Sequence, residues 1–192
     1  MSNSHFFALV SRMKYINRWA LMRNTESENL YEHSFEVAVI AHALCVIGNE
    51  RFSREYDADR AAVIALYHDF SEILTGDMPT PVKYRNESLK SEYKKVEREA
   101  AQSLIAQLPE DLRDEYGEIM LCDDENLAKI VKAADKLSAL IKCSDELKMG
   151  NSEFSSAYDS TLKAIKAMGV EEADVFINEF MPSYSLPIDK LY

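Results

Sequence analysis

The sequence predicts an all-α fold, a single-domain helical bundle over residues 1–192, and three observations carry this prediction. The chain has only five glycines and five prolines, whereas Ala, Leu, Glu, Lys and Ile recur in runs that favour helices. Apolar residues recur at intervals of three and four along most of the chain. No segment shows the clear alternation of apolar and polar residues that marks a half-buried strand.

The periodicity places the first helices in order along the chain. Apolar residues at helical spacing predict a helix from Phe6 towards Trp19, followed by a loop over residues 21–29. Residues 30–48 are apolar on nearly every side, as in a central helix, which Gly48 and Asn49 are expected to end. Asp57 is the expected N-cap of a helix that ends near Gly76.

The second half of the chain continues the helical pattern. Two prolines predict an extended loop over residues 76–83. A helix over residues 88–108 follows, with an inner stripe of Tyr93, Val96, Ala100, Leu104 and Leu108, and residues 109–120 form one or two shorter turns. Further helices are predicted over 127–150, 153–168 and 171–180, before an irregular tail. In the helix over 127–150, the expected inward residues are Ile130, Ala133, Ala134, Leu137, Leu140 and Ile141.

Charge and composition exclude several classes of protein. A formal charge of −11 argues against binding polymeric nucleic acid, which needs a basic face. Residues 5–25 nevertheless contain four basic and no acidic residues, so this zone can attract small anions. The longest apolar stretch has 12 residues, short of the ~20 that a membrane span needs. Three widely spaced cysteines form no CxxC pair, which favours a reducing, cytoplasmic location.

Ionisable residues lie on predicted inward faces, where each must be paired or ligated. His33 shares the inward stripe of the central helix, His68 and Asp69 lie on the next helix, and Asp135 lies beside the apolar stripe of a later one. Each residue alone is explained as a hydrogen-bonded core residue or a cap. Together, two histidines and two aspartates suit a divalent ion such as Mn, Co, Ni, Zn or Fe.

The motifs that hold these residues resemble a known family. "YEHS" at 31–34, "LYHDFSE" at 66–72 and "KAADKLSA" at 132–139 resemble the signature of HD-domain metal-dependent phosphohydrolases. "INRW" and "GDMPTPVKY" are similar to the bacterial 5′-deoxynucleotidases of that superfamily, and the similarity covers essentially the entire chain. One departure is Ala20, where the family pattern leads us to expect proline.

The resemblance implies one divalent transition metal ion, such as Co²⁺ or Mn²⁺, ligated by His33, His68, Asp69 and Asp135. The chain has no histidine after residue 68, so the additional histidines of binuclear HD phosphodiesterases are missing. The other two histidines, His5 and His42, are interpreted as structural.

Glu72 and Asp77 are the candidate acid–base residues. Glu72 follows His68 by four residues and so shares its predicted helix face, where it would orient or deprotonate the attacking water. The alternative is a surface glutamate in a salt bridge. The resemblance gives Asp77 a contact with the sugar hydroxyl or a role in leaving-group protonation; its alternative role is to form the turn with Gly76.

The remaining candidates are expected to bind substrate. The Arg18 guanidinium suits a phosphate oxygen, and Trp19 suits packing on sugar or base. Groups of Asp77, Met78, Pro79 and Thr80 would complete the nucleoside pocket, and the ligands His33, Asp69 and Asp135 would also border the substrate.

These expectations lead to a hydrolase of 2′-deoxynucleoside 5′-monophosphates with broad base tolerance, acting as a homodimer by family likeness. Two alternatives stay open. One is an HD-type hydrolase of tri- or pyrophosphorylated nucleotides, for which no further cluster of basic residues stands out. The other is a metal-stabilised regulatory module without turnover, which has no use for Glu72 and Arg18 together.

Overall fold

A computed structural model describes residues 4–83 and 86–192, with the backbone alone for Thr80 and Pro81. Its α-helices are α1 (Phe6–Val10), α2 (Leu30–Phe52), α3 (Ala58–Tyr67), α4 (Glu72–Thr75), α5 (Thr80–Lys83), α6 (Glu87–Ile105), α7 (Arg113–Met120), α8 (Glu125–Lys148), α9 (Ser155–Met168) and α10 (Glu171–Glu179). Short 3-10 turns cover Ser11–Tyr15, Glu110–Leu112, Ser152–Phe154, Met181–Ser185 and Ile188–Lys190. Within the described ranges there is no β-strand, so the all-α prediction is confirmed.

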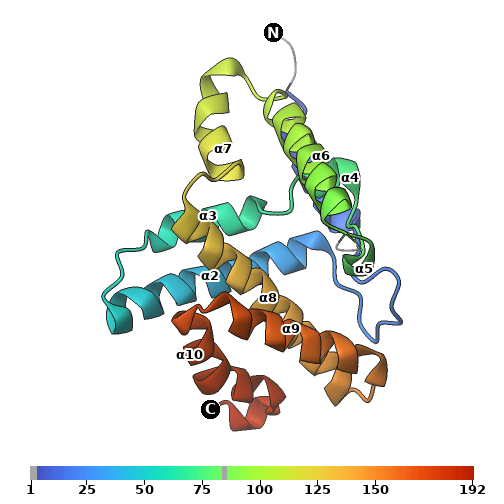
Figure 1. Ribbon diagram of the computed structural model, residues 1–192, viewed down its shortest axis with the longest axis vertical. Helices are drawn as coiled ribbons and strands as arrows, with labels where there is room; N and C mark the ends of the chain where they lie inside the picture. Colours follow the sequence, from blue (N-terminus) through green and yellow to red (C-terminus); the bar gives the residue numbers. More distant parts are fainter. Residues whose placement is uncertain (1–3, 84–85) are drawn as a thin grey trace.

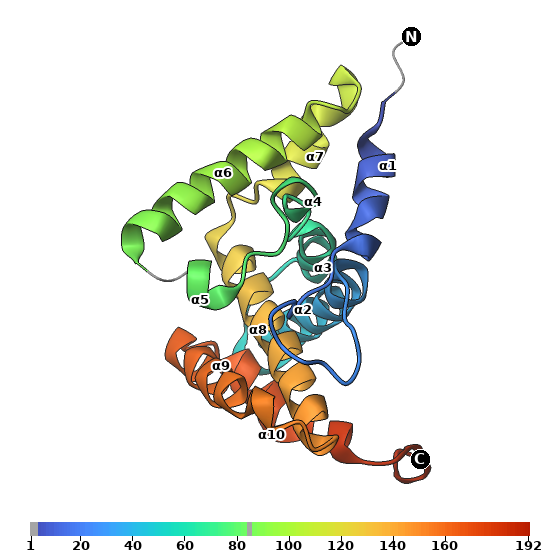
Figure 2. The same ribbon diagram turned by 90° about the vertical axis from the view of Figure 1, so that its right-hand side faces the viewer.

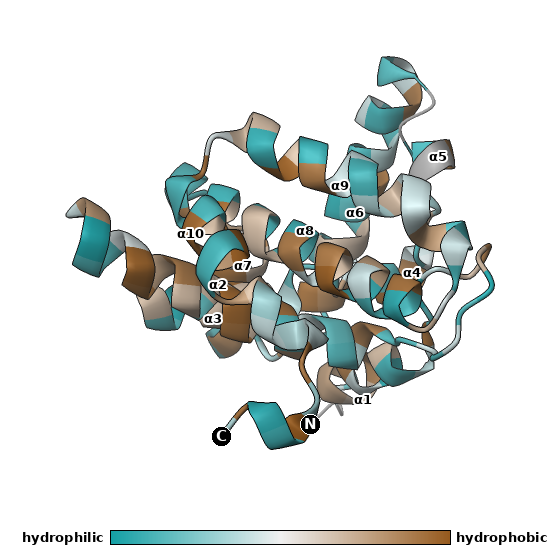
Figure 3. Cartoon of the chain, turned by 90° about the horizontal axis from the view of Figure 1, so that it is seen from below, coloured by the Kyte–Doolittle hydropathy of each residue, from teal (hydrophilic) through white to brown (hydrophobic). Residues whose placement is uncertain are grey.

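Three helices form the centre of the molecule. α8 crosses α2 and packs on both α2 and α3, while α9 and α10 cover one end and α6 and α7 lie towards the other (Figure 1). Buried apolar residues of α2, α3, α8, α9 and α10 form the larger core cluster. In Figure 3, hydrophobic residues recur along α8 and its neighbours in the middle of the view. All six inward residues predicted for α8 are buried.

α2 is the central helix that the sequence predicts. Asn29 caps it by accepting hydrogen bonds from the backbone of Tyr31 at 2.9 Å and Glu32 at 3.2 Å, and the Glu32 carboxylate accepts from the Asn29 backbone in return. By length and composition, α2 would also be able to cross a membrane, with a mean hydropathy of 1.4 over its most apolar window. More than half of that window is buried by other helices, and the core helix of a globular protein meets the same criteria.

A second, smaller core cluster lies beside the first. It joins Met13, Leu30, Phe70 and the buried face of α6 at Ala101, Leu104 and Ile105. Leu30 precedes His33 by one turn and Phe70 follows Asp69 directly, whereas Val37 and Ala65 belong to the larger cluster. The ionisable residues therefore lie where the two clusters adjoin, which shields them on several sides.

Gly48 does not end α2, contrary to the sequence prediction. The helix continues to Phe52, and Ser53 takes the left-handed conformation that ends it, with φ 53°. A Cβ on Gly48 would lie 2.7 Å from the Tyr56 ring and 3.0 Å from Glu172 Oε1. The glycine thus permits close packing across the α2–α3 connection.

Two other boundaries and one inward residue differ from the predictions. α1 ends at Val10 and tightens into the 3-10 turn Ser11–Tyr15, so no single helix runs to Trp19. The extended loop is confined to residues 76–79, because Val82 and Lys83 donate to the Pro79 carbonyl and close a helical turn. Val96 is 47% exposed, although the other four residues of the predicted α6 stripe are buried.

Candidate metal centre

Three elements bring the four predicted ligands together. His33 lies in the second turn of α2, His68 and Asp69 lie in the turn between α3 and α4, and Asp135 lies midway along α8. His33 Nε2 is 3.5 Å from Asp69 Oδ2 and 3.3 Å from Asp135 Oδ1. His68 Nε2 is 3.1 Å from Asp69 Oδ2. One donor atom each from His33, His68 and Asp135 lies within 4.8 Å of the others, as a shared ion requires.

The turn that carries His68 and Asp69 interrupts the helix predicted from Asp57 to Gly76. Asp57 caps α3 as expected, but α3 ends at Tyr67 and the following bonds join residues three apart, as from Glu72 N to Asp69 O at 2.9 Å. The Nδ1–H group of His68 donates to the Ala65 carbonyl at 2.7 Å. This bond competes with the helical ladder, and it keeps the proton on Nδ1, so that Nε2 carries the lone pair when the ring is neutral.

The free ring nitrogens show that the residues fit a metal ion. Both His33 Nε2 and His68 Nε2 are buried without a hydrogen-bond partner. Buried polar atoms without partners are costly and call for an explanation. The two nitrogens converge on two carboxylates, and this mixed set suits a borderline divalent cation.

The electrostatics of the cluster also favour a cation. Burial alone would lower the pKa of His68, but Asp69 and Asp135 raise it to about 9. Burial alone would raise the pKa of Asp69 and Asp135; the neighbouring histidines instead hold both well below the usual range. Each carboxylate is therefore ionised at neutral pH and attracts positive charge.

Glu72 lies deep beside this cluster. It begins α4, is only 5% exposed, and its Oε2 has no hydrogen-bond partner. Burial raises its pKa to about 9, and the carboxylates of Asp69 and Asp77 add to the shift. Its side chain is therefore not the surface glutamate of the alternative interpretation.

Asp77 is half-buried in the loop after α4. Burial raises its pKa, while the Arg18 guanidinium opposes the shift. Met78 and Pro79 are half-buried in the same loop, and the side chain of Thr80 lies outside the described part of the chain. Substrate contacts of these residues stay predictions.

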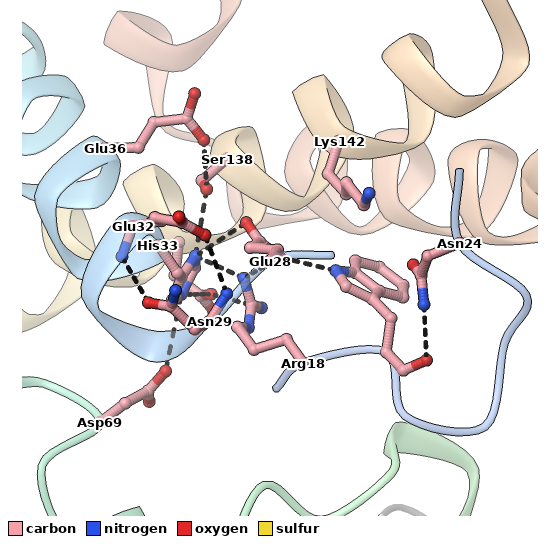
Figure 4. Close-up of polar contacts among 12 residues, drawn as sticks. Arg18, Asn24, Glu28, Asn29, Glu32, His33, Glu36, Asp69, Ser138 and Lys142 are labelled. Carbon is pink, nitrogen blue, oxygen red and sulfur yellow. Dashed lines mark hydrogen bonds and ion pairs between the residues drawn. The ribbon is translucent and has the colours of Figure 1, made fainter. Parts of the chain in front are cut away.

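Arg18 reaches the centre from the loop before α2. Its Nη2 is 3.8 Å from Asp135 Oδ1, and its Nη1 contacts His33 Nδ1 and donates to Glu28 Oε2 at 3.1 Å. Glu28 also accepts from Trp19 Nε1 at 2.8 Å, so one carboxylate orients both side chains. Figure 4 shows Glu28 pointing towards Arg18 and His33.

Trp19 adopts a strained backbone conformation. Its φ is 58°, in the left-handed region that costs a non-glycine residue ~1–2 kcal/mol. The Asn24 side chain donates to the Trp19 carbonyl at 3.2 Å, and the indole ring packs on Phe154 at a centroid distance of 5.4 Å. These contacts hold the indole next to Arg18.

Sequence reasoning missed three polar residues of the site. The sequence places Glu28 only in the loop over residues 21–29. The Ser138 hydroxyl lies 3.1 Å from His33 Nδ1 and donates to Glu36 Oε2 at 2.6 Å (Figure 4). Ser138, itself hydrogen-bonded to Glu36, therefore contacts the His33 ring on the side away from Nε2. The spacing carried a signal, because Ser138 follows Asp135 by three residues and Glu36 follows His33 by three. Such partners orient metal-ligating histidines.

A histidine, an adjacent His-Asp pair and a later aspartate on a helical scaffold define an HD-domain phosphohydrolase. The fold supports this class: an HD-domain phosphohydrolase from Listeria innocua matches with a TM-score of 0.81 and 25% identity, over 94% of this chain and 88% of that one. A cyanophage S-2L HD phosphohydrolase, solved with dA and one catalytic Zn²⁺ ion, has the same fold, with a TM-score of 0.69 and 21% identity over 96% and 97% of the two chains.

The chain belongs to the family described as 5′-deoxynucleotidase YfbR-like, whose model matches residues 5–184. A 5′-deoxynucleotidase of Pectobacterium atrosepticum is 49% identical over 100% of this chain and 97% of its own length. Another from Vibrio vulnificus is 46% identical over 100% of both chains.

Proposed function

We propose that this protein is a 5′-deoxynucleotidase, which hydrolyses 2′-deoxynucleoside 5′-monophosphates to deoxynucleosides and phosphate with broad base tolerance. The observation that carries the proposal is the convergence of two unpartnered histidine nitrogens and two carboxylates beside an arginine. Full-length relatives named 5′-deoxynucleotidase support the same activity.

His33, His68, Asp69 and Asp135 would hold one divalent ion, with cobalt or manganese as the proposed metal. When bound, the ion supplies positive charge for phosphoryl oxygens and lowers the pKa of water. The cyanophage neighbour holds dA and a single zinc ion, so zinc belongs in the same test.

The protein's own residues then divide the remaining work. Arg18, oriented by Glu28, binds a phosphate oxygen and stabilises charge that develops during hydrolysis. Glu72 holds or moves the proton of the attacking water, and Asp77 contacts the sugar or protonates the leaving alkoxide. Glu72 is buried and Asp77 is half-buried, and the charge of Asp69 helps to raise the pKa of each, which supports either carboxyl group in the main acid–base role.

The nucleoside would lie between Trp19 and the loop of residues 77–80, next to His33, Asp69 and Asp135. Rigid surfaces against C2′ would exclude a hydroxyl group, because it would be crowded and left without a partner. One such buried polar group costs ~1–3 kcal/mol, which is roughly 5- to 150-fold in kcat/KM.

Matched substrates test the activity and the sugar preference together. We expect phosphate release from dAMP, dGMP and dTMP with added Co²⁺, Mn²⁺ or Zn²⁺, and lower kcat/KM for AMP, GMP and UMP. Equal values for each pair would refute the sugar preference alone. Phosphate release only from nucleoside triphosphates would favour the hydrolase of tri- or pyrophosphorylated nucleotides. No release from any substrate would favour the regulatory module without turnover.

Arg18→Ala is expected to raise KM for the monophosphates while the metal content stays at the wild-type level. Arg18→Lys should restore activity only in part, because an ammonium group lacks the planar pair of donors. Arg51→Ala is a matched control, since this arginine pairs with Glu179 at the surface. Kinetics and elemental analysis on the same samples provide the measurement, and an unchanged KM in Arg18→Ala would place the phosphate elsewhere.

We further propose that the chain is a single-domain cytoplasmic protein that forms a homodimer. The outer face of α2 supports the dimer: Tyr31, Phe35, Val39 and Val46 are each more than 40% exposed, and exposed apolar stripes mark interaction surfaces. A second copy with the same stripe is self-complementary. Sedimentation velocity should show a dimer for the wild type and a monomer for Val39→Glu; a wild-type monomer contradicts the proposal.

A further inference from the structure

Glu146 is a buried carboxylate outside the metal centre. It lies near the end of α8, three turns beyond Asp135, and is 1% exposed. Both of its oxygens accept from Thr25 N, at 3.1 and 3.0 Å. Its other donors are Thr25 Oγ1 at 2.8 Å, Glu26 N at 3.4 Å, Asn151 Nδ2 at 2.8 Å and Lys142 Nζ at 2.5 Å.

These donors connect α8 to the loop of residues 17–29, hereafter the 17–29 loop. Asn17 and Asn29 form an isolated bridge at the base of the loop, and Arg18 N donates to Glu28 O at 2.9 Å. Glu146 binds the opposite part of the loop, at Thr25 and Glu26. In Figure 2, the blue segment that leads into α2 loops beside α8.

Two hydrogen-bond partners of Glu146 also bind the 17–29 loop directly. Lys142 Nζ donates to Glu26 O at 2.6 Å, and Asn151 Nδ2 donates to Arg23 O at 2.6 Å. Burial alone would raise the pKa of Glu146, but hydrogen bonds from Lys142, Asn151 and Thr25 lower it to about 2. The group is therefore a charged acceptor at neutral pH, and charge-assisted hydrogen bonds are the stronger kind.

The 17–29 loop carries Arg18, Trp19 and Glu28, whose positions all depend on its path. The left-handed backbone at Trp19 persists only where surrounding contacts hold it. We propose that Glu146 is a positioning residue, which fixes the 17–29 loop against α8 and thereby places Arg18 and Trp19 at the metal centre. The expected effect of Glu146 on substrate binding rests on the proposed function, whereas its expected effect on the conformation of the loop does not.

Trp19 is the single tryptophan of the chain, so its fluorescence reports on this loop alone. In Glu146→Gln we expect a red-shifted emission and easier quenching by acrylamide, because the ring leaves Phe154. We also expect KM for dAMP to rise, with kcat/KM roughly 10- to 100-fold lower and metal content unchanged, since small misplacements of a positioning group cost up to about 10²-fold. Unchanged Trp19 emission in folded Glu146→Gln would overturn the proposal.

Glu153→Gln is the matched control, because Glu153 also binds the loop but does so only at the exposed Arg23, whose side chain donates at 3.0 Å and whose backbone N–H donates at 3.3 Å. Such surface pairs contribute little. Its Trp19 emission and KM should equal those of the wild type; shifts as large as in Glu146→Gln would show that any loop contact suffices and would refute the assignment to Glu146.

Two measurements remain decisive if Glu146→Gln does not fold. Thr25→Ala removes only the hydroxyl donor to Glu146, and it should shift Trp19 emission to the red by less than Glu146→Gln does. In the unaltered protein, the amides of Thr25 and Glu26 should exchange slowly with solvent although both side chains are exposed. Fast exchange of both would overturn the proposal. These readouts need no substrate, so an absence of phosphatase activity would refute the proposed function and leave this test intact.

Discussion

Asp135→Ala is expected to lose the metal ion and nearly all phosphatase activity while keeping its helical circular dichroism. The substitution removes a carboxylate 3.3 Å from His33 Nε2, and it also takes away a partner of Arg18. Activity should fall by more than about 100-fold, since even changes to residues behind the ligands cost roughly 10- to 100-fold. The fold should survive, because the neighbouring residues Ala134 and Leu137 pack in an apolar core.

Elemental analysis after metal loading gives the measurement. The wild type should hold one divalent ion per chain, and Asp135→Ala should hold far less than one. Asp159→Ala, at an exposed position on α9, is the control and should match the wild type. Two tightly held ions in the wild type would contradict the single-ion proposal, and an Asp135→Ala protein with full metal content would remove Asp135 from the ligand set.

Glu72→Gln is expected to keep the metal and bind the nucleotide but to turn over ~10²–10⁴ times more slowly, the range of general acid–base catalysis. Glutamine preserves the volume of this buried side chain and removes its ability to exchange a proton. A fall in kcat with an unchanged dissociation constant identifies a group that acts in the transition state.

Glu172→Gln provides a control at a similarly buried glutamate, which lies at the start of α10, pairs with Arg54 and should affect stability alone. Single-turnover rates and equilibrium binding of dAMP to each variant distinguish the cases. A decrease below tenfold in Glu72→Gln would assign the acid–base role to Asp77, which Asp77→Asn would then test.

Apolar periodicity and sequence motifs were enough to predict most of the helices, their buried faces and the expected metal ligands of this protein. The apolar spacing in α8 predicts six inward residues, all of which are buried, and the sequence predicts Asp57 as the cap of α3, because both features depend on neighbours within one or two turns. The inward position of His33 followed from its register with Val37 and Leu44. The resemblance to a family motif groups the four expected metal ligands.

Contacts that the apolar periodicity does not encode decided the remainder. Gly48 looks like a helix stop in sequence, but the Tyr56 ring and Glu172 make it a packing position. Local periodicity also missed the break after Tyr67, because the bond from the His68 ring to the Ala65 carbonyl competes with the helical ladder.

Glu28 and Glu146 show the same limit at the site itself. Glu146 meets Thr25 across 121 residues of sequence, and no helical or strand period relates such positions. A carboxylate in a loop or on a helix is ordinarily solvated, so its residue type alone carries no sign of burial. Only the packing of α8 against the 17–29 loop removes Glu146 from water, and that burial makes its hydrogen bonds strong enough to position Arg18 and Trp19.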